Sequence, residues 1–311
     1  MTSTPPDSTS AATTENTAPI RFAIPKGRMA EGVHALLKDA GIRIRAGARD
    51  YRPTINLAGY TVKILKPRAV IEMLDLGTRD LGFAGADWVA EDSRDIVELL
   101  DTRLDPVRLV AAAPESILVD GPNGRLLPDR PLRVASEYAN LTKRWMNAND
   151  IKGEFVLSYG ATEVLPPDDA DCIVDNTATG ATLAANGLRI LDDLASSSTR
   201  LYASKQAMAD DAKRARIEEF VMLVQSVLEA RSRVTLEVNI AADRLPSLLE
   251  TLPCMREPTV ASTYAGSDTT TPTGFAVKVA VPRADLPTLI PQIKAKGGTD
   301  IIVTNPEQIV P

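Results

Sequence analysis

Cysteine and histidine are scarce in this chain, and it has no long hydrophobic run. Its 311 residues include two cysteines, Cys172 and Cys254, and one histidine, His34. The cysteines lie far apart with no paired spacing, so the sequence supports neither a disulfide framework nor a structural zinc site. No apolar stretch approaches the ~18 residues that cross a bilayer, which excludes a helical membrane protein. His34 lies in a predicted helix and is expected to be structural rather than catalytic.

The composition is that of a globular protein with an acidic balance. Hydrophobic residues make up 44% of the chain and charged residues 24%, as in ordinary soluble domains. The formal net charge of −6 argues against a general nucleic-acid surface, although local basic clusters can still bind phosphate groups. Residues 1–19 are rich in Ser, Thr and Pro and lack the features of a secretory signal. We therefore expect a disordered tail on a cytoplasmic protein.

Strands and helices alternate through the first part of the chain. The expected elements are strands at 20–25, 62–65 and about 80–87 and helices at about 29–40 and 68–76. Lys26-Gly27-Arg28 connects the first strand to its helix. This alternation predicts a parallel-rich sheet with helices on both faces, and hence an α/β fold.

The middle of the chain predicts a second lobe over residues 107–198. Its expected elements are strands at 107–113, 132–135, 154–157 and 171–174 and a helix at 139–148. A strand at 199–205 and a long charged helix at 209–231 then return to the first lobe, which comprises residues 20–106 plus 199–231.

Residues 232–311 predict a separate small domain. Its expected elements are strands at 234–240, 275–281 and 300–304, helices at 242–251 and 284–296, and Pro/Gly-rich loops between them. The order is similar to a β-α-β-β-α-β unit, which is a ferredoxin-like α+β arrangement.

An apolar strand ends in Asp175 and runs into a loop of small residues up to Leu183. The loop contains the hydroxyl side chains and the glycine of Thr177, Thr179, Gly180 and Thr182. Small residues let backbone N–H groups approach an anion, and the hydroxyls add donors. Asp175 is placed to accept hydrogen bonds from ribose hydroxyls. These residues predict a ribose-phosphate site, whereas a simple turn with a helix N-cap would need no ligand.

Together these segments resemble the long form of ATP phosphoribosyltransferase, the first enzyme of histidine biosynthesis, over about residues 20–311. The most specific part is residues 171–183 with Asn186-Gly187-Leu188, which matches the family signature in order and spacing. Supporting matches are Lys26-Gly27-Arg28, Arg49, Gly77, Asp80, Gly82, Gly85, Asp87, Tyr138, Lys143-Arg144, Leu252-Pro253, residues 257–260 and residues 296–303.

The resemblance implies that phosphoribosyl pyrophosphate reacts with ATP. Adenine N1 attacks the anomeric carbon, and magnesium-bound pyrophosphate leaves, so Mg2+ is the expected cofactor. The resemblance also implies two lobes like those of periplasmic binding proteins and a C-terminal domain that binds histidine as an inhibitor. A homodimer or homohexamer is expected, with no nucleic-acid or membrane partner. Because N1 has a lone pair and no proton to lose, positioning should outweigh proton transfer.

The resemblance also implies roles for individual residues. Asp175 and Glu163 would face the ribose as catalytic carboxylates. The phosphoribosyl pyrophosphate site would comprise Asp175, Thr177, Ala178, Thr179, Gly180, Ala181 and Thr182. ATP or pyrophosphate would contact Lys26, Gly27, Arg28, Arg49, Lys66, Arg68, Asp87 and Tyr138. No metal ligand is assigned. Single basic residues are otherwise ordinary surface charges, Asp87 could be a helix N-cap, and Tyr138 could be a core residue.

The chain departs from the family pattern at several positions. Residues 166–169 are Pro-Pro-Asp-Asp where the family usually has a glycine, and residues 176–178 are more polar than usual. Ala139 replaces a common proline, and Cys254 replaces a favoured glycine in the domain expected to bind histidine. Two alternatives therefore stay open. One is a catalytically silent regulatory relative, and the other is a two-lobed small-molecule binding protein.

Overall fold

The computed structural model describes residues 18–45, 47, 51–121, 124–253, 257–264 and 270–310. Most of the predicted tail lies outside this part of the chain, as do Arg49 and Cys254.

An eight-stranded sheet runs through two lobes. Its strands, in spatial order, are β10 (Gly153–Leu157), β9 (Leu132–Ser136), β11 (Cys172–Thr177), β6 (Val97–Pro114), β12 (Leu188–Ala203), β5 (Leu81–Gly85), β1 (Ile20–Pro25) and β4 (Tyr60–Leu65). We call the part around β5, β1 and β4 the first lobe and the part around β11, β9 and β10 the second lobe. Neighbouring strands within each of these trios are parallel.

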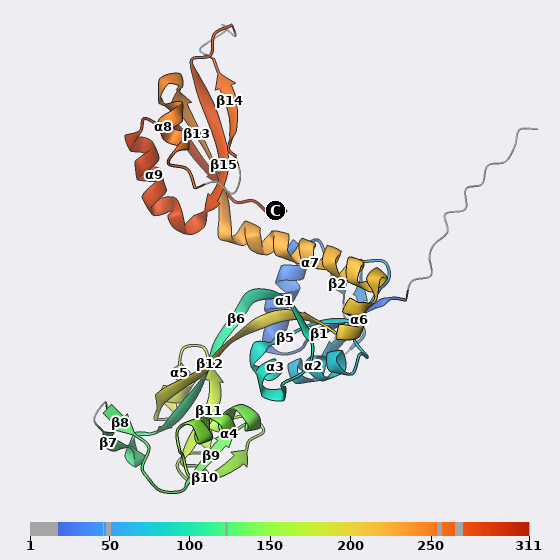
Figure 1. Cartoon of the computed structure of the whole chain (residues 1–311), viewed down its shortest axis with the longest axis vertical. Helices are drawn as coiled ribbons and strands as arrows, with labels where there is room; N and C mark the ends of the chain where they lie inside the picture. Colours follow the sequence, from blue (N-terminus) through green and yellow to red (C-terminus); the bar gives the residue numbers. More distant parts are fainter. Residues whose placement is uncertain are drawn as a thin grey trace, which may run out of the picture.

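The antiparallel pair β6 and β12 joins the two lobes (Figure 1). The end of β12 pairs with the start of β6 in the first lobe, and the start of β12 pairs with the end of β6 in the second. Their register shifts between Ser197 and Thr199, and Arg103 and Asp105 on β6 have positive φ. Both strands are longer than the predicted 107–113 and 199–205. Polar residues and Pro106 interrupt the alternation in the missed parts, which are held by pairing with each other.

Apolar side chains from both faces of the sheet form the lobe cores. In the first lobe, α1 (Arg28–Asp39) and α7 (Asp211–Ser232) cover one face and α2 (Pro67–Asp75) the other. Buried Val33, Leu36 and Leu37 form the inner stripe of α1, as helical spacing requires. In the second lobe, α4 (Ala139–Ala148) packs on one face and α5 (Ala181–Ala185) on the other.

Short elements complete the two lobes. They are β2 (Ile44–Arg45), β3 (Thr54–Ile55), α3 (Ala86–Asp92), β7 (Val119–Gly121), β8 (Gly124–Leu126), α6 (Lys205–Ala209) and 3₁₀ turns at Glu115–Ile117 and Thr162–Val164.

The C-terminal domain has its own four-stranded antiparallel sheet, with strand order β14-β15-β13-β16. Its elements are β13 (Arg233–Ala241), a 3₁₀ turn (Ala242–Arg244), α8 (Leu245–Leu249), β14 (Thr259–Thr263), β15 (Gly274–Pro282), a 3₁₀ turn (Arg283–Asp285), α9 (Leu286–Ala295) and β16 (Thr299–Thr304). Alternate residues of β13 pack against both helices. The predicted α/β class with a ferredoxin-like C-terminal domain is confirmed, although the sequence did not predict β14.

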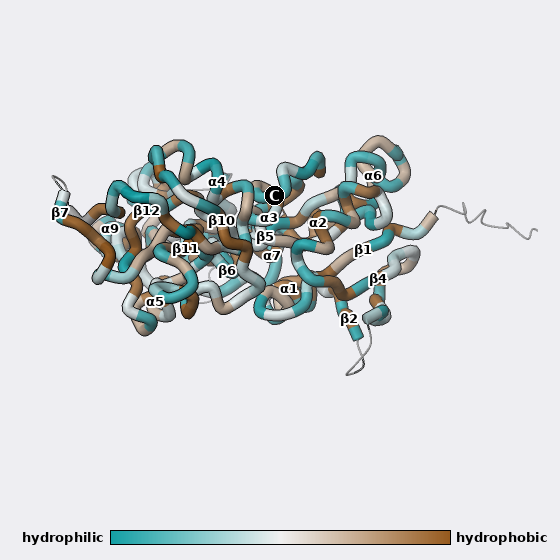
Figure 2. Tube along the Cα trace, turned by 90° about the horizontal axis from the view of Figure 1, so that it is seen from below, coloured by the Kyte–Doolittle hydropathy of each residue, from teal (hydrophilic) through white to brown (hydrophobic). Residues whose placement is uncertain are grey.

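Helix α7 connects this domain to the first lobe (Figure 1). Phe220 and Val224 of α7 belong to the first-lobe core, α7 ends at Ser232, and β13 begins at the next residue. Beyond β16 the chain returns, and the Ile309 N–H donates to the Ser226 carbonyl (2.9 Å). Hydropathy is mixed along the tube in Figure 2, and no helix in the described ranges is both long and apolar enough to span a membrane.

Candidate functional site

The first lobe gathers several predicted site residues at the carboxyl edge of its parallel strands. Lys26 follows β1 and Lys66 follows β4, and these strands pair in register up to Pro25 and Leu65. Asp87 lies just beyond β5, the other neighbour of β1. The carboxyl ends of strands in open α/β sheets are where ligands usually bind.

The second lobe presents carboxylates at the corresponding edge. Asp175 lies near the end of β11, and Glu137 directly follows the parallel neighbour β9. Glu163 lies in a 3₁₀ turn that is anchored by a hydrogen bond between the hydroxyls of Ser158 and Thr162 (2.7 Å). Both glutamates are close enough to Asp175 to act on its ionisation.

Asp175 has an unusual charge environment for an aspartate. Burial raises its pKa to about 6, and the negative charges of Glu163 and Glu137 also raise it. The Asn176 backbone N–H donates to its Oδ1 (2.7 Å) and opposes the shift. The carboxylate is thus ionised at neutral pH at an energetic cost that a bound cationic centre would offset.

The loop after Asp175 is folded by its own hydroxyls. The Thr177 hydroxyl, which is buried, accepts the Gly180 N–H (2.9 Å), and the Thr179 hydroxyl accepts the Ala181 N–H (3.3 Å). Gly180 has φ +81°, a left-handed conformation that favours glycine. Ala178, Thr179, Ala181 and Thr182 remain exposed, so the loop presents small residues and hydroxyls to solvent.

A buried hydrogen-bond network links the two lobes through Asp87. The Tyr138 hydroxyl donates to Asp87 Oδ2 (2.6 Å) and accepts from the Asn176 amide (2.8 Å). The Ser197 hydroxyl, on β12, donates to Asp87 Oδ1 (2.8 Å). Burial and the Asp87 charge raise the pKa of Tyr138, so its hydroxyl stays protonated. Tyr138 also stacks on Trp88, with ring centroids 4.5 Å apart.

The basic residues differ in their availability. Lys26, Gly27, Arg28 and Lys66 are exposed, and α1 begins after Gly27 without a side-chain cap. The Arg68 guanidinium pairs with Asp92 (2.7 Å) and lies over Trp88. Asp92 accepts from Nε and Nη2 of Arg68, so a phosphate would have to share the guanidinium with this ion pair.

Known proteins match almost the whole of this chain. The family model "ATP phosphoribosyltransferase" matches residues 66–226, and the model "HisG, C-terminal domain" matches residues 230–308. An ATP phosphoribosyltransferase of Pelotomaculum thermopropionicum is 33% identical over 94% of this chain and 99% of its own length. The chain belongs to the ATP phosphoribosyltransferase family.

Further relatives agree with this membership. An ATP phosphoribosyltransferase of Desulforudis audaxviator is 32% identical, over 94% of this chain and 99% of its own. A solved structure of an ATP phosphoribosyl transferase (HisG:HisZ) complex from Thermotoga maritima has a TM-score of 0.59 and 27% identity. It covers 68% of this chain and 98% of that chain. The predicted long form of ATP phosphoribosyltransferase is therefore confirmed as the family.

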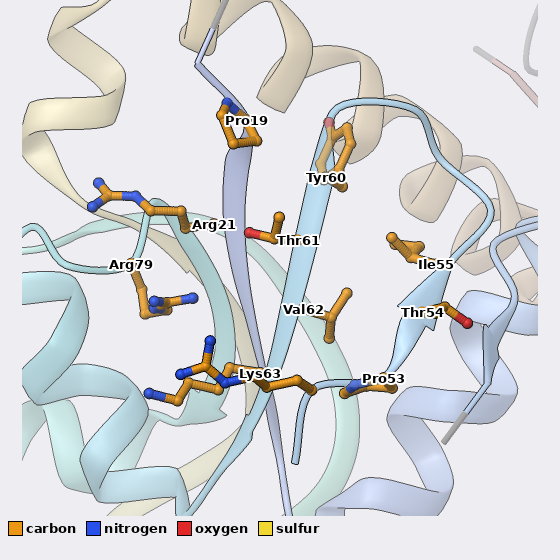
Figure 3. Close-up of a pocket in the computed structure, with 11 residues that line it drawn as sticks. Pro19, Arg21, Pro53, Thr54, Ile55, Tyr60, Thr61, Val62, Lys63 and Arg79 are labelled. Atoms are coloured by element: carbon orange, nitrogen blue, oxygen red, sulfur yellow. The ribbon is translucent and has the colours of Figure 1, made fainter. Parts of the chain in front are cut away.

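A basic cavity of about 600 Å³ lies away from these residues, beside the edge strand β4 (Figure 3). It is lined by Pro19, Arg21, Arg52, Pro53, Thr54, Ile55, Tyr60, Thr61, Val62, Lys63 and Arg79. Among the residues that the structure describes, none predicted for ATP phosphoribosyltransferase activity belongs to this lining. Arg21 is held there by buried Asp80 (2.7 Å), which also binds Lys213 of α7.

Sequence reasoning did not identify several residues of the site. Glu137 could have been found, because it follows a strand in the same way as Asp175. Ser197 gave no signal, because its partner Asp87 is 110 residues away along the chain. Asn176 was noted only as a departure from the family of ATP phosphoribosyltransferases, yet it donates to Tyr138.

Proposed function

We propose that this chain transfers the 5-phosphoribosyl group of phosphoribosyl pyrophosphate to N1 of ATP. The products are N1-(5-phospho-β-D-ribosyl)-ATP and pyrophosphate. This would be the first step of histidine biosynthesis. Besides family membership, one observation carries the proposal. A half-buried carboxylate with a raised pKa, Asp175, lies near the end of β11, and the strand leads at Thr177 into an exposed loop of small residues and hydroxyls.

The ribose and its 5′-phosphate would bind at this loop. Exposed Thr179 and Thr182 would donate hydroxyls to phosphate oxygens, and Gly180 lets the loop turn without a side chain in the way. Asp175 would accept hydrogen bonds from the ribose hydroxyls, with Glu163 beside it. As the bond to pyrophosphate lengthens, the ribose gains positive charge, which the ionised Asp175 stabilises.

The leaving pyrophosphate and the ATP phosphates would face the first lobe. Lys26, Arg28 and Lys66 are exposed at its carboxyl edge and would balance the negative charge that develops there. Arg49 is part of this prediction but lies outside the described residues. Asp87 and Tyr138 would line the buried side of this cleft. Because the Tyr138 hydroxyl already donates to Asp87, they would fix its shape. None of these side chains needs to move a proton.

The carboxylates of the second lobe fit Mg2+, which the family implies. Mg2+ is commonly held by one or two carboxylates together with substrate phosphates. In the described part of the chain no three His, Cys, Asp or Glu side chains form a metal cage. Asp175 with Glu163 or Glu137 could supply the carboxylates, and substrate oxygens the rest. When bound, Mg2+ would neutralise charge on the leaving pyrophosphate.

Regulation and assembly belong to the same proposal. The C-terminal domain would bind histidine as a feedback inhibitor, and the chain would form a homodimer or homohexamer in the cytoplasm. The lobe boundaries at residues 106/107, 198/199 and 231/232 stay predictions.

The test is formation of phosphoribosyl-ATP from the two substrates with Mg2+ and pyrophosphatase present. We expect product with the unaltered chain, at least 10²-fold less with Asp175→Ala, and suppression by histidine. Asp169→Ala, an exposed carboxylate in the same lobe, is the matched control and should keep full activity. No product from folded protein at saturating substrates would overturn the proposal in favour of a silent relative or a binding protein.

A further inference from the structure

Two short helices from different lobes meet head to tail. Helix α3 follows β5 of the first lobe, and α4 follows β9 of the second. The last residues of α3 contact the first turn of α4. A helix leaves N–H groups unsatisfied at its start and carbonyl groups at its end, so this junction brings complementary polar groups together.

Glu91, the penultimate residue of α3, satisfies the start of α4. Its Oε1 accepts the Asn140 N–H (2.8 Å), and its Oε2 accepts the Leu141 N–H (2.9 Å). Helix α4 begins after Tyr138, which gives no side-chain cap, so the cap comes from the other lobe. Glu91 is 1% exposed, and a buried carboxylate without these partners would be costly.

Helix α4 in turn satisfies the end of α3. The Asn140 side-chain amide donates to the Glu91 carbonyl (2.9 Å), and the Arg144 guanidinium donates to the Ala90 carbonyl (2.9 Å). Each helix therefore caps the other across the lobe boundary. Four hydrogen bonds of this kind define the angle between the helices more closely than apolar packing would.

The connection through the sheet is less strictly defined. The strands β6 and β12 change register between Ser197 and Thr199, and Arg103 and Asp105 have left-handed backbone conformations. An irregular two-stranded connection can bend and twist, so the angle between the lobes needs a second point of support. The α3–α4 junction is such a point.

We infer that Glu91 is a positioning residue that fixes the angle between the lobes. It would thereby set the distance between the phosphoribosyl loop and the ATP-facing edge. This rests on the proposed function, in which each lobe binds one reactant. Tyr138 directly precedes α4 and bonds to Asn176, so the junction is continuous with Asp175. Small errors in the alignment of two reactants lower the rate without weakening either binding step.

The kinetic test compares Glu91→Ala with Glu91→Gln and with a control, Asp95→Ala. Asp95 is an exposed carboxylate in the segment that follows α3. For Glu91→Ala we expect kcat to fall at least 10-fold. This kcat is expressed per phosphoribosyl pyrophosphate binding site, and the number of sites is measured by titration calorimetry. The Kd for this substrate alone should change less than threefold. Glu91→Gln keeps one acceptor and should recover part of kcat, and Asp95→Ala should equal the unaltered chain.

A distance measurement tests the inference without catalysis. Spin labels at Glu72→Cys and Glu154→Cys, in a Cys172→Ala and Cys254→Ala background, report the separation of the lobes by pulsed electron paramagnetic resonance. We expect one narrow distribution in the background chain and a clearly broadened one when Glu91→Ala is added.

Three outcomes would overturn the inference. They are an unbroadened distribution, an unchanged kcat per site, and a loss of substrate affinity as large as the loss of kcat. If Glu91→Ala does not fold, Glu91→Gln is judged by the same criteria. If the unaltered chain makes no product, the proposed function fails, and the distance distributions still decide whether Glu91 holds the lobes.

Discussion

Replacing Asp175 with asparagine removes the charge of this carboxylate and keeps its shape. The asparagine oxygen can still accept the Asn176 N–H, a bond of 2.7 Å to Oδ1 in the structure. The pKa of Asp175 is about 6 in the fold against 3.8 for a free aspartate. At ~1.4 kcal/mol per pH unit, keeping this group ionised at neutral pH costs at most about 3 kcal/mol of stability.

We expect Asp175→Asn to stabilise the protein while it abolishes most of the activity. Because the group is partly exposed, the full cost is reduced to about 1–2 kcal/mol, or about 2–6 °C in Tm at pH 7.5. Calorimetry measures the first effect. The phosphoribosyl-ATP assay measures the second, a loss of at least 10²-fold. A gain in stability with a loss of activity is typical of a charge that is held for function.

The pH dependence of stability tests whether the charge of Asp175 causes the difference in Tm. Between about pH 4 and pH 6 the folded state holds a proton on Asp175 that the unfolded state has lost, so this group's contribution to stability decreases as pH rises through that range. The Tm difference between variant and unaltered chain should therefore vanish near pH 4. The exposed control Asp169→Asn should shift neither curve. A variant that is less stable than the unaltered chain at pH 7.5 would refute the reasoning.

Three further changes test other parts of the site. Tyr138→Phe leaves the buried Asp87 carboxylate and the Asn176 amide without their shared hydroxyl, and should cost about 2–3 kcal/mol in urea unfolding; a cost under 0.5 would contradict the network. Gly180→Ala strains a residue at φ +81° and places Cβ 3.3 Å from Ile190, so the KM for phosphoribosyl pyrophosphate should rise at least fivefold; an unchanged KM would remove the loop from the site. Arg68→Met leaves the Asp92 carboxylate, which is 7% exposed, without its cationic partner and should cost about 1–3 kcal/mol in urea unfolding; an unchanged stability would contradict the ion pair. Steady-state kinetics then decides its role, since a drop in kcat/KM places Arg68 at the phosphates and unchanged kinetics removes it.

Local patterns predicted the elements that have strong local signals. The helix at 139–148 and the strand at 20–25 have the expected bounds, because apolar periodicity marks both. The same patterns placed Asp175 at the end of a strand, next to its loop. These signals lie within a few residues of each other, so one sequence suffices to find them.

What the sequence did not predict depends on distant partners. The outer parts of β6 and β12 have weak alternation and are strands because they pair with each other. Glu91 looks like an ordinary helix carboxylate in the sequence, and only the meeting of two lobes buries it. The pairing of Arg68 with Asp92 likewise depends on how α2 and α3 pack. Predicting such contacts requires the relative placement of elements, which periodicity does not contain.

The direct passage from α7 into β13 has a mechanical consequence. No residue separates the end of the helix at Ser232 from the start of the strand at Arg233, and the returning C-terminal segment is tied to Ser226 on the same helix. The C-terminal domain is therefore rigidly coupled to the first-lobe core around Phe220. A rotation of this domain must either bend α7 or rotate the first lobe with it. A few glycines inserted after Ser232 would uncouple the two and leave each domain intact.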